Sequence, residues 1–395
     1  MTRPASDPVL IIGGGIGGLP AALALERQGV TTAVFERASA IGDVGAGISL
    51  GLTASKGLYS LGLESVIRAA SDAPRTFEAV HYQTGNILGG GFADRTFAPG
   101  DLRFLNQIHR ADLFEILRQA LERLNPQALR LGQTFARFDQ DEESVTATFA
   151  DGSRVRGTAL IGCDGIRSLT RGQMFGEESP RFTGRVAYRF LVPMQDARPF
   201  MGAGGSISSV APGQSLLRYA IRHDALVNCV AFIRSESWRG EGWSERVPVE
   251  ELCALFEGWH PDVQGLARNA PLYGTAKWGL YDRDPLPVWT RGRVTLLGDA
   301  AHPMLPFLGL GAAMAIEDGV ILARAFAAKA CATEALRVYE AARSDRAGEM
   351  VLASRHQGEI FADGPEGEKR PKINRRESMN YDPGTAPLQV DMGLA

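Results

Sequence analysis

Four consecutive apolar residues, Val9–Ile12, run directly into a glycine-rich sequence in which Gly13, Gly15 and Gly18 have the spacing GxGxxG. A segment with helical spacing of apolar residues follows, and then a second apolar strand that ends at Glu36. In a dinucleotide-binding unit the first glycine permits a tight turn, the second lets the pyrophosphate approach the backbone, and the third lets helix and strand pack closely. The helix N-terminus attracts the phosphates, and the acid accepts hydrogen bonds from a ribose diol. The spacing therefore predicts a dinucleotide-binding α/β domain at the start of the chain.

The glycine content and the charge balance narrow the class of ligand. The 395 residues include 46 glycines, about 12% against an average of roughly 7%. They are concentrated in residues 13–18, 42–51, 162–171 and 298–311, where a backbone without Cβ atoms can approach a bound dinucleotide. The 42 basic and 45 acidic side chains leave a formal charge of −3, which argues against nucleic acid as a partner.

Two further motifs follow strand-like segments later in the chain. Residues 159–171 read ALIGCDGIRSLTR, and residues 293–303 read RVTLLGDAAHP. The first resembles the DG motif of flavoprotein hydroxylases, with Asp164 and Arg171 at its characteristic positions. The second resembles their second flavin fingerprint, in which Asp299 bonds the ribityl chain. Together the motifs resemble the class A, single-component flavoprotein aromatic monooxygenases of the para-hydroxybenzoate hydroxylase fold, and most closely the salicylate hydroxylase-like branch.

This resemblance implies a cofactor and a reaction. It implies one non-covalent FAD, NADH or NADPH as a transient co-substrate, and O2, with hydroxylation of a phenolic or heteroaromatic small molecule through a C4a-hydroperoxyflavin. No second GxGxxG opens a helix, because Gly89-Gly90-Gly91 reads as a loop between strands. The alternative on the same fold is a flavin-dependent epoxidase or reductase. A halogenase is disfavoured, since Trp238 and Trp243 do not form a Trp-x-Trp-x-Ile-Pro segment, and a non-enzymatic flavin-binding scaffold is disfavoured by the intact motifs.

The resemblance also assigns roles to particular positions. The residues expected to bind FAD are Gly13, Gly15, Gly18, Glu36, Arg37, Gly47, Arg110, Asp164, Asp299, Pro306, Gly309, Gly311 and Ala312. Catalysis is expected from Tyr219, Ser215 and Pro306, and the substrate pocket from Ser215, Tyr219, Leu310 and Arg189. The four cysteines lack metal-ligand spacing, and no metal is expected.

The strand expected to face the substrate departs from the family pattern. Relatives carry Gly-Pro-Gly-x-His-x-x-x-Tyr, whereas residues 211–219 read APGQSLLRY, so that Tyr219 is kept and Ser215 replaces the histidine. Leu310 stands where many relatives have glutamine. These changes favour a larger, more apolar or heteroaromatic ring over a simple hydroxybenzoate.

Positive charge near this strand offers several partners for a substrate carboxylate. Arg189, Arg218 and Arg222 are each candidates, because a guanidinium binds a carboxylate through two parallel hydrogen bonds. His223, in the sequence Arg222-His223-Asp224, is expected to be exposed in a turn rather than catalytic.

The distribution of motifs predicts the domain organisation. A Rossmann-like FAD-binding domain, formed by residues 1–75, 100–178 and 280–328, is interrupted by a β-rich substrate domain of residues 76–99 and 179–279. Residues 329–395 form a C-terminal helix and a tail, with a charged, solvated segment near 363–376. No apolar stretch reaches the ~18 residues of a spanning helix, and the dispersed cysteines fit reduced thiols. We therefore expect a cytoplasmic monomer or homodimer that acts on a small aromatic molecule, without membrane attachment.

Overall fold

The computed structural model describes residues 7–40, 47–74, 76–90, 105–202, 205–236, 238, 245–270, 275–363 and 380–388. The expected loop at 42–46, Trp243 and the expected tail at 364–376 lie outside these residues. Among the described residues, no helix is long and apolar enough to cross a membrane. All four cysteines are free thiols.

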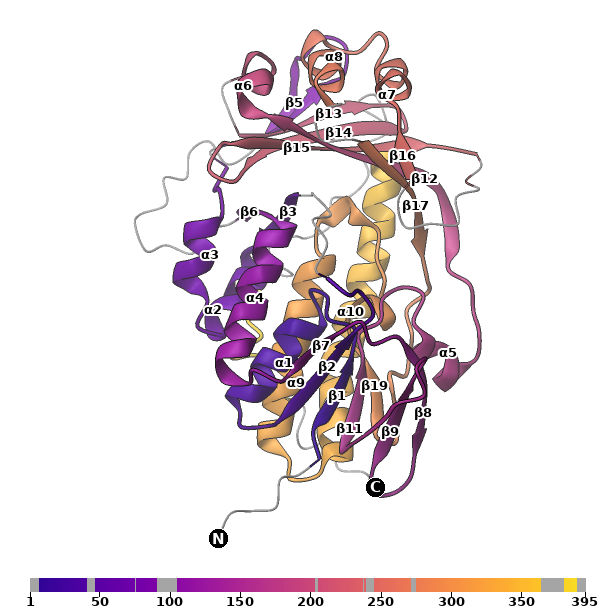
Figure 1. Ribbon diagram of the computed structural model, residues 1–395. Coiled ribbons are helices and arrows are strands. Elements are labelled where there is room, and N and C mark those ends of the chain that lie inside the picture. The colour runs from indigo at the N-terminus through magenta and orange to yellow at the C-terminus, as the bar shows by residue number, and fades with distance from the viewer. Residues whose placement is uncertain are drawn as a thin grey trace.

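A six-stranded sheet lies in the lower half of the molecule (Figure 1). Five of its strands are parallel, and β18 pairs with β19 in the antiparallel direction. Every residue of the central strands β1 and β11 is buried, as continuous apolar strands with both faces covered require. The order of the strands is β18 (Thr290–Arg291), β19 (Val294–Leu296), β11 (Ala159–Gly162), β1 (Val9–Ile12), β2 (Thr32–Glu36) and β7 (Leu129–Leu131).

The carboxyl ends of the parallel strands bring the sequence motifs together. Ile12 is in register with Gly162 of β11, and Gly162 with Leu296 of β19. The glycine-rich loop, the DG motif and the Gly298-Asp299 turn therefore begin side by side at one edge of the sheet, where open α/β sheets bind their ligands. The predicted α/β fold class is confirmed.

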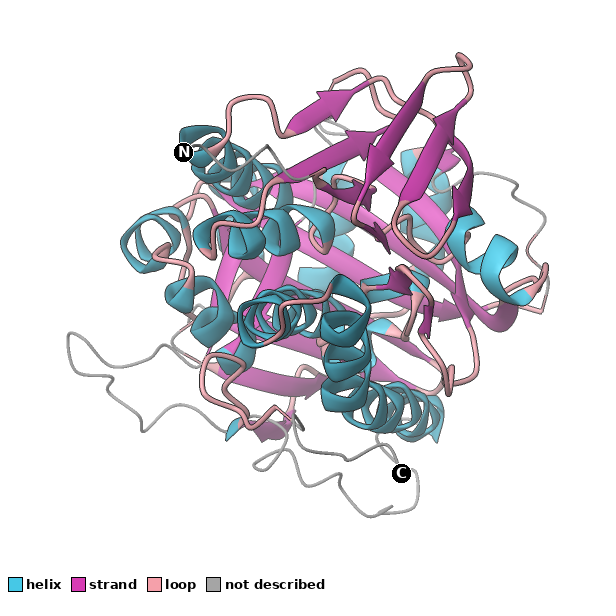
Figure 2. Cartoon of the chain, turned by 90° about the horizontal axis from the view of Figure 1, so that it is seen from below, coloured by secondary structure: helices cyan, strands magenta, loops and turns pink. Residues whose placement is uncertain are grey.

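Helices cover one side of this sheet, and a three-stranded antiparallel sheet lies on the other (Figures 1 and 2). Helix α1 packs against both α9 and α4, and α9 packs against α2 and α10. The helices are α1 (Gly18–Arg27), α2 (Leu52–Ser60), α3 (Glu64–Ala70), α4 (Arg110–Leu124), α9 (Gly311–Ala328) and α10 (Ala332–Asp363). The small sheet is formed by β8 (Phe135–Gln140), β9 (Val145–Phe149) and β10 (Arg154–Gly157), and α5 (Leu169–Phe175) contacts β8.

An eight-stranded sheet spans the upper half of the molecule (Figure 1). A two-stranded sheet of β3 (Gly47–Gly51) and β6 (Leu105–His109) lies beneath it, in contact with β14. The strand order is β16 (Glu245–Val247), β17 (Thr275–Asp282), β12 (Arg181–Pro193), β15 (Leu226–Arg234), β14 (Gln214–Ile221), β13 (Ser206–Ala211), β4 (Phe77–His81) and β5 (Ile87–Gly90).

The two faces of the eight-stranded sheet bury different residues because side chains alternate along each strand. The outer face carries Leu216, Cys229 and Phe190, which form a core under the helices α6 (Met194–Ala197), α7 (Val249–Leu255) and α8 (Pro261–Arg268). The inner face is turned toward the six-stranded half and carries the alternate residues, among them Tyr219.

Two strands from the N-terminal part of the chain complete this sheet: β4 pairs with β13, and β5 pairs with β4. This pairing supports the predicted division of the chain into a discontinuous cofactor domain and a substrate domain, which we propose here. One detail of the prediction is wrong: Gly89 and Gly90 lie in β5 and not in a loop. The strand could not be recognised from the sequence because glycines show no alternation of apolar and polar side chains. An edge strand such as β5 nevertheless tolerates glycine.

Candidate active site

The loop after β1 contains glycines with two different surroundings. A Cβ atom at Gly13 would lie 2.3 Å from the carbonyl oxygen of Cys163, and one at Gly18 would lie 1.9 Å from the carbonyl oxygen of Gly13. Gly13 also has a φ of +103°, which side chains rarely adopt. A Cβ atom at Gly15, by contrast, would meet nothing within 4 Å. Two glycines therefore shape the loop, while the backbone at Gly15 is bare toward space that a pyrophosphate can enter.

Glu36 joins the end of β2 to this loop. Its Oε2 accepts a hydrogen bond from the backbone N–H of Gly14 at 2.9 Å, and its Oε1 accepts one from Ala38 at 2.9 Å. Each carboxylate oxygen keeps a second lone pair, so Glu36 can still accept a hydrogen bond from a ribose hydroxyl. The next residue, Arg37, is exposed.

The DG motif is a rigid turn at the start of α5. The Asp164 carboxylate accepts hydrogen bonds from the backbone N–H and the hydroxyl of Thr170, at 3.0 and 3.1 Å, and from the Ser168 hydroxyl. The buried Arg171 then donates to the carbonyl oxygens of Ala300 and Ala301. The motif thus connects two of the strand ends, and burial raises the pKa of Asp164 although these hydrogen bonds lower it.

Asp299 lies in the turn after β19, and Arg110 is the first residue of α4. Asp299 is exposed although its neighbours Gly298 and Ala300 are buried. Desolvation nevertheless raises the pKa of Asp299, while the charges of His302 and Arg110 lower it. A carboxylate that is accessible to solvent and also surrounded by protein lies in a recess. Arg110, the first residue of α4, is exposed as well and within electrostatic reach of Asp299.

The segment between Asp299 and α9 borders the same region. Pro306 and Gly309 are exposed, and Gly309 has a φ of +67° that ends the short helical turn Pro306–Leu308. Leu310, Gly311 and Ala312 are half-buried, whereas α9 is buried from Ala313 to Ala323. The free N–H groups of the first turn of α9 therefore lie at its accessible end, where they stabilise negative charge.

The inner face of β14 presents Ser215 and Tyr219 at separate places. Ser215 is buried and pairs with Phe232 of β15, whose ring lies 5.2 Å from the ring of Phe307. Four residues of strand span roughly 13 Å, so Tyr219 lies too far along β14 to reach the same atom of a small substrate. The structure thus places Ser215 beside the Pro306–Leu308 turn and Tyr219 elsewhere.

Tyr219 lies where β3 meets the eight-stranded sheet. A Cβ atom at Gly47 would be 2.8 Å from the Tyr219 ring, and the backbone N–H of Gly47 donates to the Asn228 side chain at 2.7 Å. Burial raises the pKa of Tyr219 to about 12, against the opposing effects of the Arg189 charge and of Ser49. Tyr219 therefore keeps its proton at neutral pH and can donate a hydrogen bond.

The structure separates the three candidate arginines. Arg222 forms two hydrogen bonds with Asp112, at 2.9 and 2.7 Å, and Arg218 lies on the outer face of the sheet, bonded to Ser209. Arg189 lies on the inner face, and its guanidinium is 4.9 Å from the Trp278 ring centre. Among the described residues it has no carboxylate partner, and its buried Nε has no hydrogen-bond partner.

The electrostatic surroundings of Arg189 leave its charge uncompensated. Desolvation lowers the pKa of Arg189, Tyr219 raises it and the charge of Arg110 lowers it further. An arginine stays protonated in spite of such a shift, and burying an unpaired charge is costly. Arg189 therefore offers a half-buried cation to a negatively charged group of a ligand.

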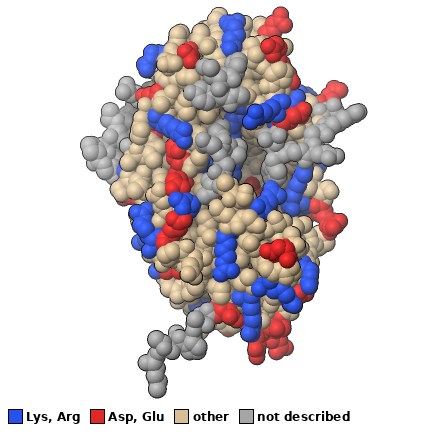
Figure 3. All heavy atoms as spheres, viewed as in Figure 1, with Lys and Arg blue, Asp and Glu red and all other residues tan. Residues whose placement is uncertain are grey.

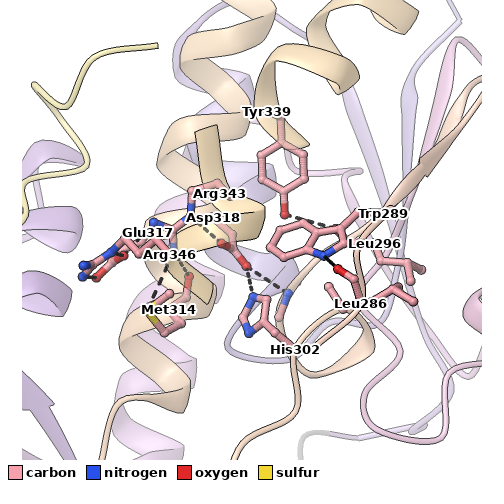
Figure 4. Close-up of polar contacts among 12 residues, drawn as sticks. Leu286, Trp289, Leu296, His302, Met314, Glu317, Asp318, Tyr339, Arg343 and Arg346 are labelled. Atoms are coloured by element: carbon pink, nitrogen blue, oxygen red, sulfur yellow. Dashed lines mark hydrogen bonds and ion pairs between the residues drawn. The ribbon is translucent and has the colours of Figure 1, made fainter. Parts of the chain in front are cut away.

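A buried ion cluster behind the Gly298-Asp299 turn was not predicted (Figure 4). Asp318 accepts hydrogen bonds from the backbone N–H of Gly298 at 3.1 Å and from Arg343 at 2.7 Å, and its Oδ2 lies 2.6 Å from His302 Nε2. Arg343 also pairs with Glu317 at 2.8 Å. The sequence does carry a signal for this cluster: Glu317 and Asp318 are two acidic residues within the apolar segment that forms α9. A buried acid needs a partner, so these residues indicate a buried ion pair.

Comparison with known proteins finds relatives that match most of this chain. Residues 6–354 match the family model described as FAD binding domain. The chain is 36% identical, over 90% of its length and 89% of the relative's, to 3-amino-4-hydroxybenzoate 2-monooxygenase of Streptomyces platensis. It is 32% identical, over 88% of its length and 90% of the relative's, to 6-hydroxynicotinate 3-monooxygenase of Pseudomonas fluorescens. A salicylate hydroxylase substrate complex superposes with a TM-score of 0.79 at 27% identity, covering 96% of this chain and 97% of that one.

Proposed function

The chain belongs to the FAD-binding family of class A flavoprotein aromatic monooxygenases, and from that premise we propose that the protein hydroxylates an anionic aromatic or heteroaromatic small molecule bound in this recess. Hydroxylation with NAD(P)H and O2 is favoured over epoxidation or reduction, because relatives matched over most of the chain include a 3-amino-4-hydroxybenzoate 2-monooxygenase and a 6-hydroxynicotinate 3-monooxygenase. The observation that carries the proposal of an anionic substrate is Arg189, a half-buried cation without a carboxylate partner among the described residues.

The cofactor site fits FAD at the positions where the structure is open. Gly15 presents bare backbone to the pyrophosphate, Glu36 accepts from the ribose, and Asp299 and Arg110 face the recess beyond. We propose that Gly311 and Ala312, in the first turn of α9, stabilise negative charge on the flavin ring. Bound FAD supplies the transfer of electrons from NAD(P)H to O2 and the oxygen atom that enters the aromatic ring.

We propose that the inner sheet face holds the substrate. Arg189 binds a carboxylate or an ionised hydroxyl, and Phe232 and Phe307 exclude water from the ring beside Ser215. Tyr219 keeps its proton and donates a hydrogen bond, while Pro306 and Leu310 close the side next to α9. Ser215 in place of histidine favours a hydroxylated N-heteroaromatic acid over a simple hydroxybenzoate.

The charge on Arg189 is tested by comparing acids with neutral analogues. We expect Arg189→Met to raise KM for hydroxybenzoates and hydroxynicotinates about tenfold or more, because a charge-assisted hydrogen bond contributes roughly 1.5–3 kcal/mol. The corresponding carboxamides should show little change. Steady-state NAD(P)H oxidation gives both values, with Arg137→Met, at an exposed ion pair, as the control. An equal change for acids and carboxamides would show that Arg189 does not bind the substrate charge.

In the same assay, Tyr219→Phe removes one hydroxyl and leaves the packed ring in place. We expect the yield of hydroxylated product per NAD(P)H to fall several-fold while the FAD content of the purified protein stays unchanged, since proton-donating groups contribute to chemistry rather than to cofactor retention. A variant that purifies without flavin would place Tyr219 in the scaffold between β3 and β14.

We propose a cytoplasmic monomer or homodimer whose partners are the small aromatic substrate and NADH or NADPH. On the face shown in Figure 3, basic and acidic side chains are interspersed, and no single-sign field of the kind that nucleic acid binds covers it.

A further inference from the structure

The turn that connects β14 and β15 has an unusual backbone. Arg222, His223 and Asp224 have φ values of 55°, 57° and 58°, and they are the only described residues other than glycine with positive φ. The left-handed region is unfavourable for residues with a Cβ atom, so three in succession persist only where other contacts hold them. The turn begins three residues after Tyr219 and joins β14 to β15, two neighbouring strands of the eight-stranded sheet.

The contacts that hold this turn come from the cofactor half of the molecule. The Arg222 guanidinium donates two hydrogen bonds to Asp112 of α4, and its Nη2 lies 3.3 Å from His109 Nδ1. The backbone N–H of His223 donates to Asp72 at 2.9 Å. Asp72 in turn exchanges two backbone hydrogen bonds of 2.8 Å with Gln107 of β6. The turn is therefore attached at two points to the β6–α4 corner.

That corner is where Arg110 begins α4. His109 caps the helix by accepting a hydrogen bond from the backbone N–H of Ala111 at 3.3 Å. Arg222 thus contacts the residue before Arg110 and the residue two positions after it. Movement of the turn would move β14, with Tyr219, relative to the helix end that carries Arg110.

We propose that the Arg222–Asp224 turn is a positioning latch, which fixes the substrate-facing strand β14 relative to the Arg110 end of the cofactor recess. This proposal rests on the proposed function, because its consequence is the efficiency with which NAD(P)H oxidation is coupled to hydroxylation. Arg222 is a positioning residue: it contacts Asp112 and His109, and it acts through α4 and β14. Misplacement of reacting groups by about 1 Å costs as much as a hundredfold in rate.

The test compares Arg222→Ala, Arg222→Lys and Asp112→Asn with two controls. Asp224→Gly replaces one residue of the same turn by glycine, which adopts a positive φ without strain, so the turn can keep its conformation. Arg137→Ala removes a charge from an exposed ion pair. We expect Arg222→Ala and Asp112→Asn to divert several-fold more NAD(P)H to hydrogen peroxide at unchanged FAD content. The double variant should be no worse than either single variant, because both remove the same contact, and Arg222→Lys should recover part of the coupling. Additive effects, or wild-type coupling in Arg222→Ala, would overturn the proposal.

Hydrogen–deuterium exchange separates failure of the latch from failure of the proposed function. In Arg222→Ala we expect faster exchange both in the β14–β15 turn and in the first turn of α4, whether or not any aromatic compound is hydroxylated. If exchange rises in the β14–β15 turn alone, the turn does not position α4 and the latch is refuted. If exchange rises at both places but the wild-type protein hydroxylates no compound, the latch stands and the proposed function fails.

Discussion

Replacing Gly15 by alanine leaves the protein folded but weakens FAD binding by at least about tenfold, which corresponds to roughly 1.4 kcal/mol. The added Cβ atom meets no protein atom within 4 Å, so the native packing does not change. It enters the space through which a pyrophosphate must reach the backbone N–H groups of the loop. Fluorescence titration of deflavinated protein with FAD measures the affinity, and thermal unfolding of the same sample measures stability.

Two other glycines provide the comparison. Gly18→Ala places a Cβ atom 1.9 Å from a backbone oxygen, and we expect it to destabilise the fold itself. Gly89→Ala, on the exposed edge strand β5 with no atom within 4 Å, should change neither property. If Gly15→Ala binds FAD as tightly as the wild type, the open space beside this loop is not the pyrophosphate site.

Asp318→Asn is expected to lower the free energy of unfolding by about 3–5 kcal/mol, because it removes a buried carboxylate that Arg343 and His302 contact and leaves the cluster with one negative charge fewer. Burial alone would raise the pKa of Asp318, but the charges and hydrogen bonds of His302 and Arg343 lower it to about 2. The folded-state pKa is thus below the ordinary value of 3.8. The stabilisation is fully present above about pH 4 and is lost as pH falls toward 2.

Urea unfolding at several pH values between 2 and 7 measures this difference for Asp318→Asn. The matched control is Glu64→Gln, which breaks an exposed ion pair with Arg68 and should cost less than about 1 kcal/mol. We also expect weaker FAD retention in Asp318→Asn, because Asp318 holds the backbone of Gly298 beside Asp299. A loss of stability as small as that of the control would show that the cluster is not an organising element of the turn.

The sequence predicts the local units of the fold well because their physical signals are local. The apolar run before Gly13, the helix after it and the strand that ends at Glu36 all form as expected. The same kind of local signal, apolar residues three and four positions apart, is present in α4, which buries Leu113, Leu117 and Leu121. A position where no Cβ atom fits can also be recognised from the sequence, because glycine is the residue found there.

Features that depend on pairing between distant segments could not be predicted. The sequence offers Arg189, Arg218 and Arg222 each as a partner for a substrate carboxylate, and it is the sheet register that places Arg189 and Arg218 on different faces and Arg222 beside Asp112. Likewise, Asp164 and Gly47 read as cofactor contacts, whereas the structure shows Asp164 bonded to Thr170 and Gly47 packed against Tyr219. Whether they also touch FAD stays a prediction.

Turnover under ¹⁸O2 tests the central claim most directly. Purified, FAD-loaded protein is supplied with NADH or NADPH and a panel of hydroxylated benzoic and N-heteroaromatic acids, and products are analysed by mass spectrometry. We predict that at least one acid stimulates NAD(P)H oxidation and gains one ¹⁸O atom per molecule, as monooxygenation requires. NAD(P)H oxidation that no acid stimulates, with all of the label recovered as hydrogen peroxide, would contradict the assignment.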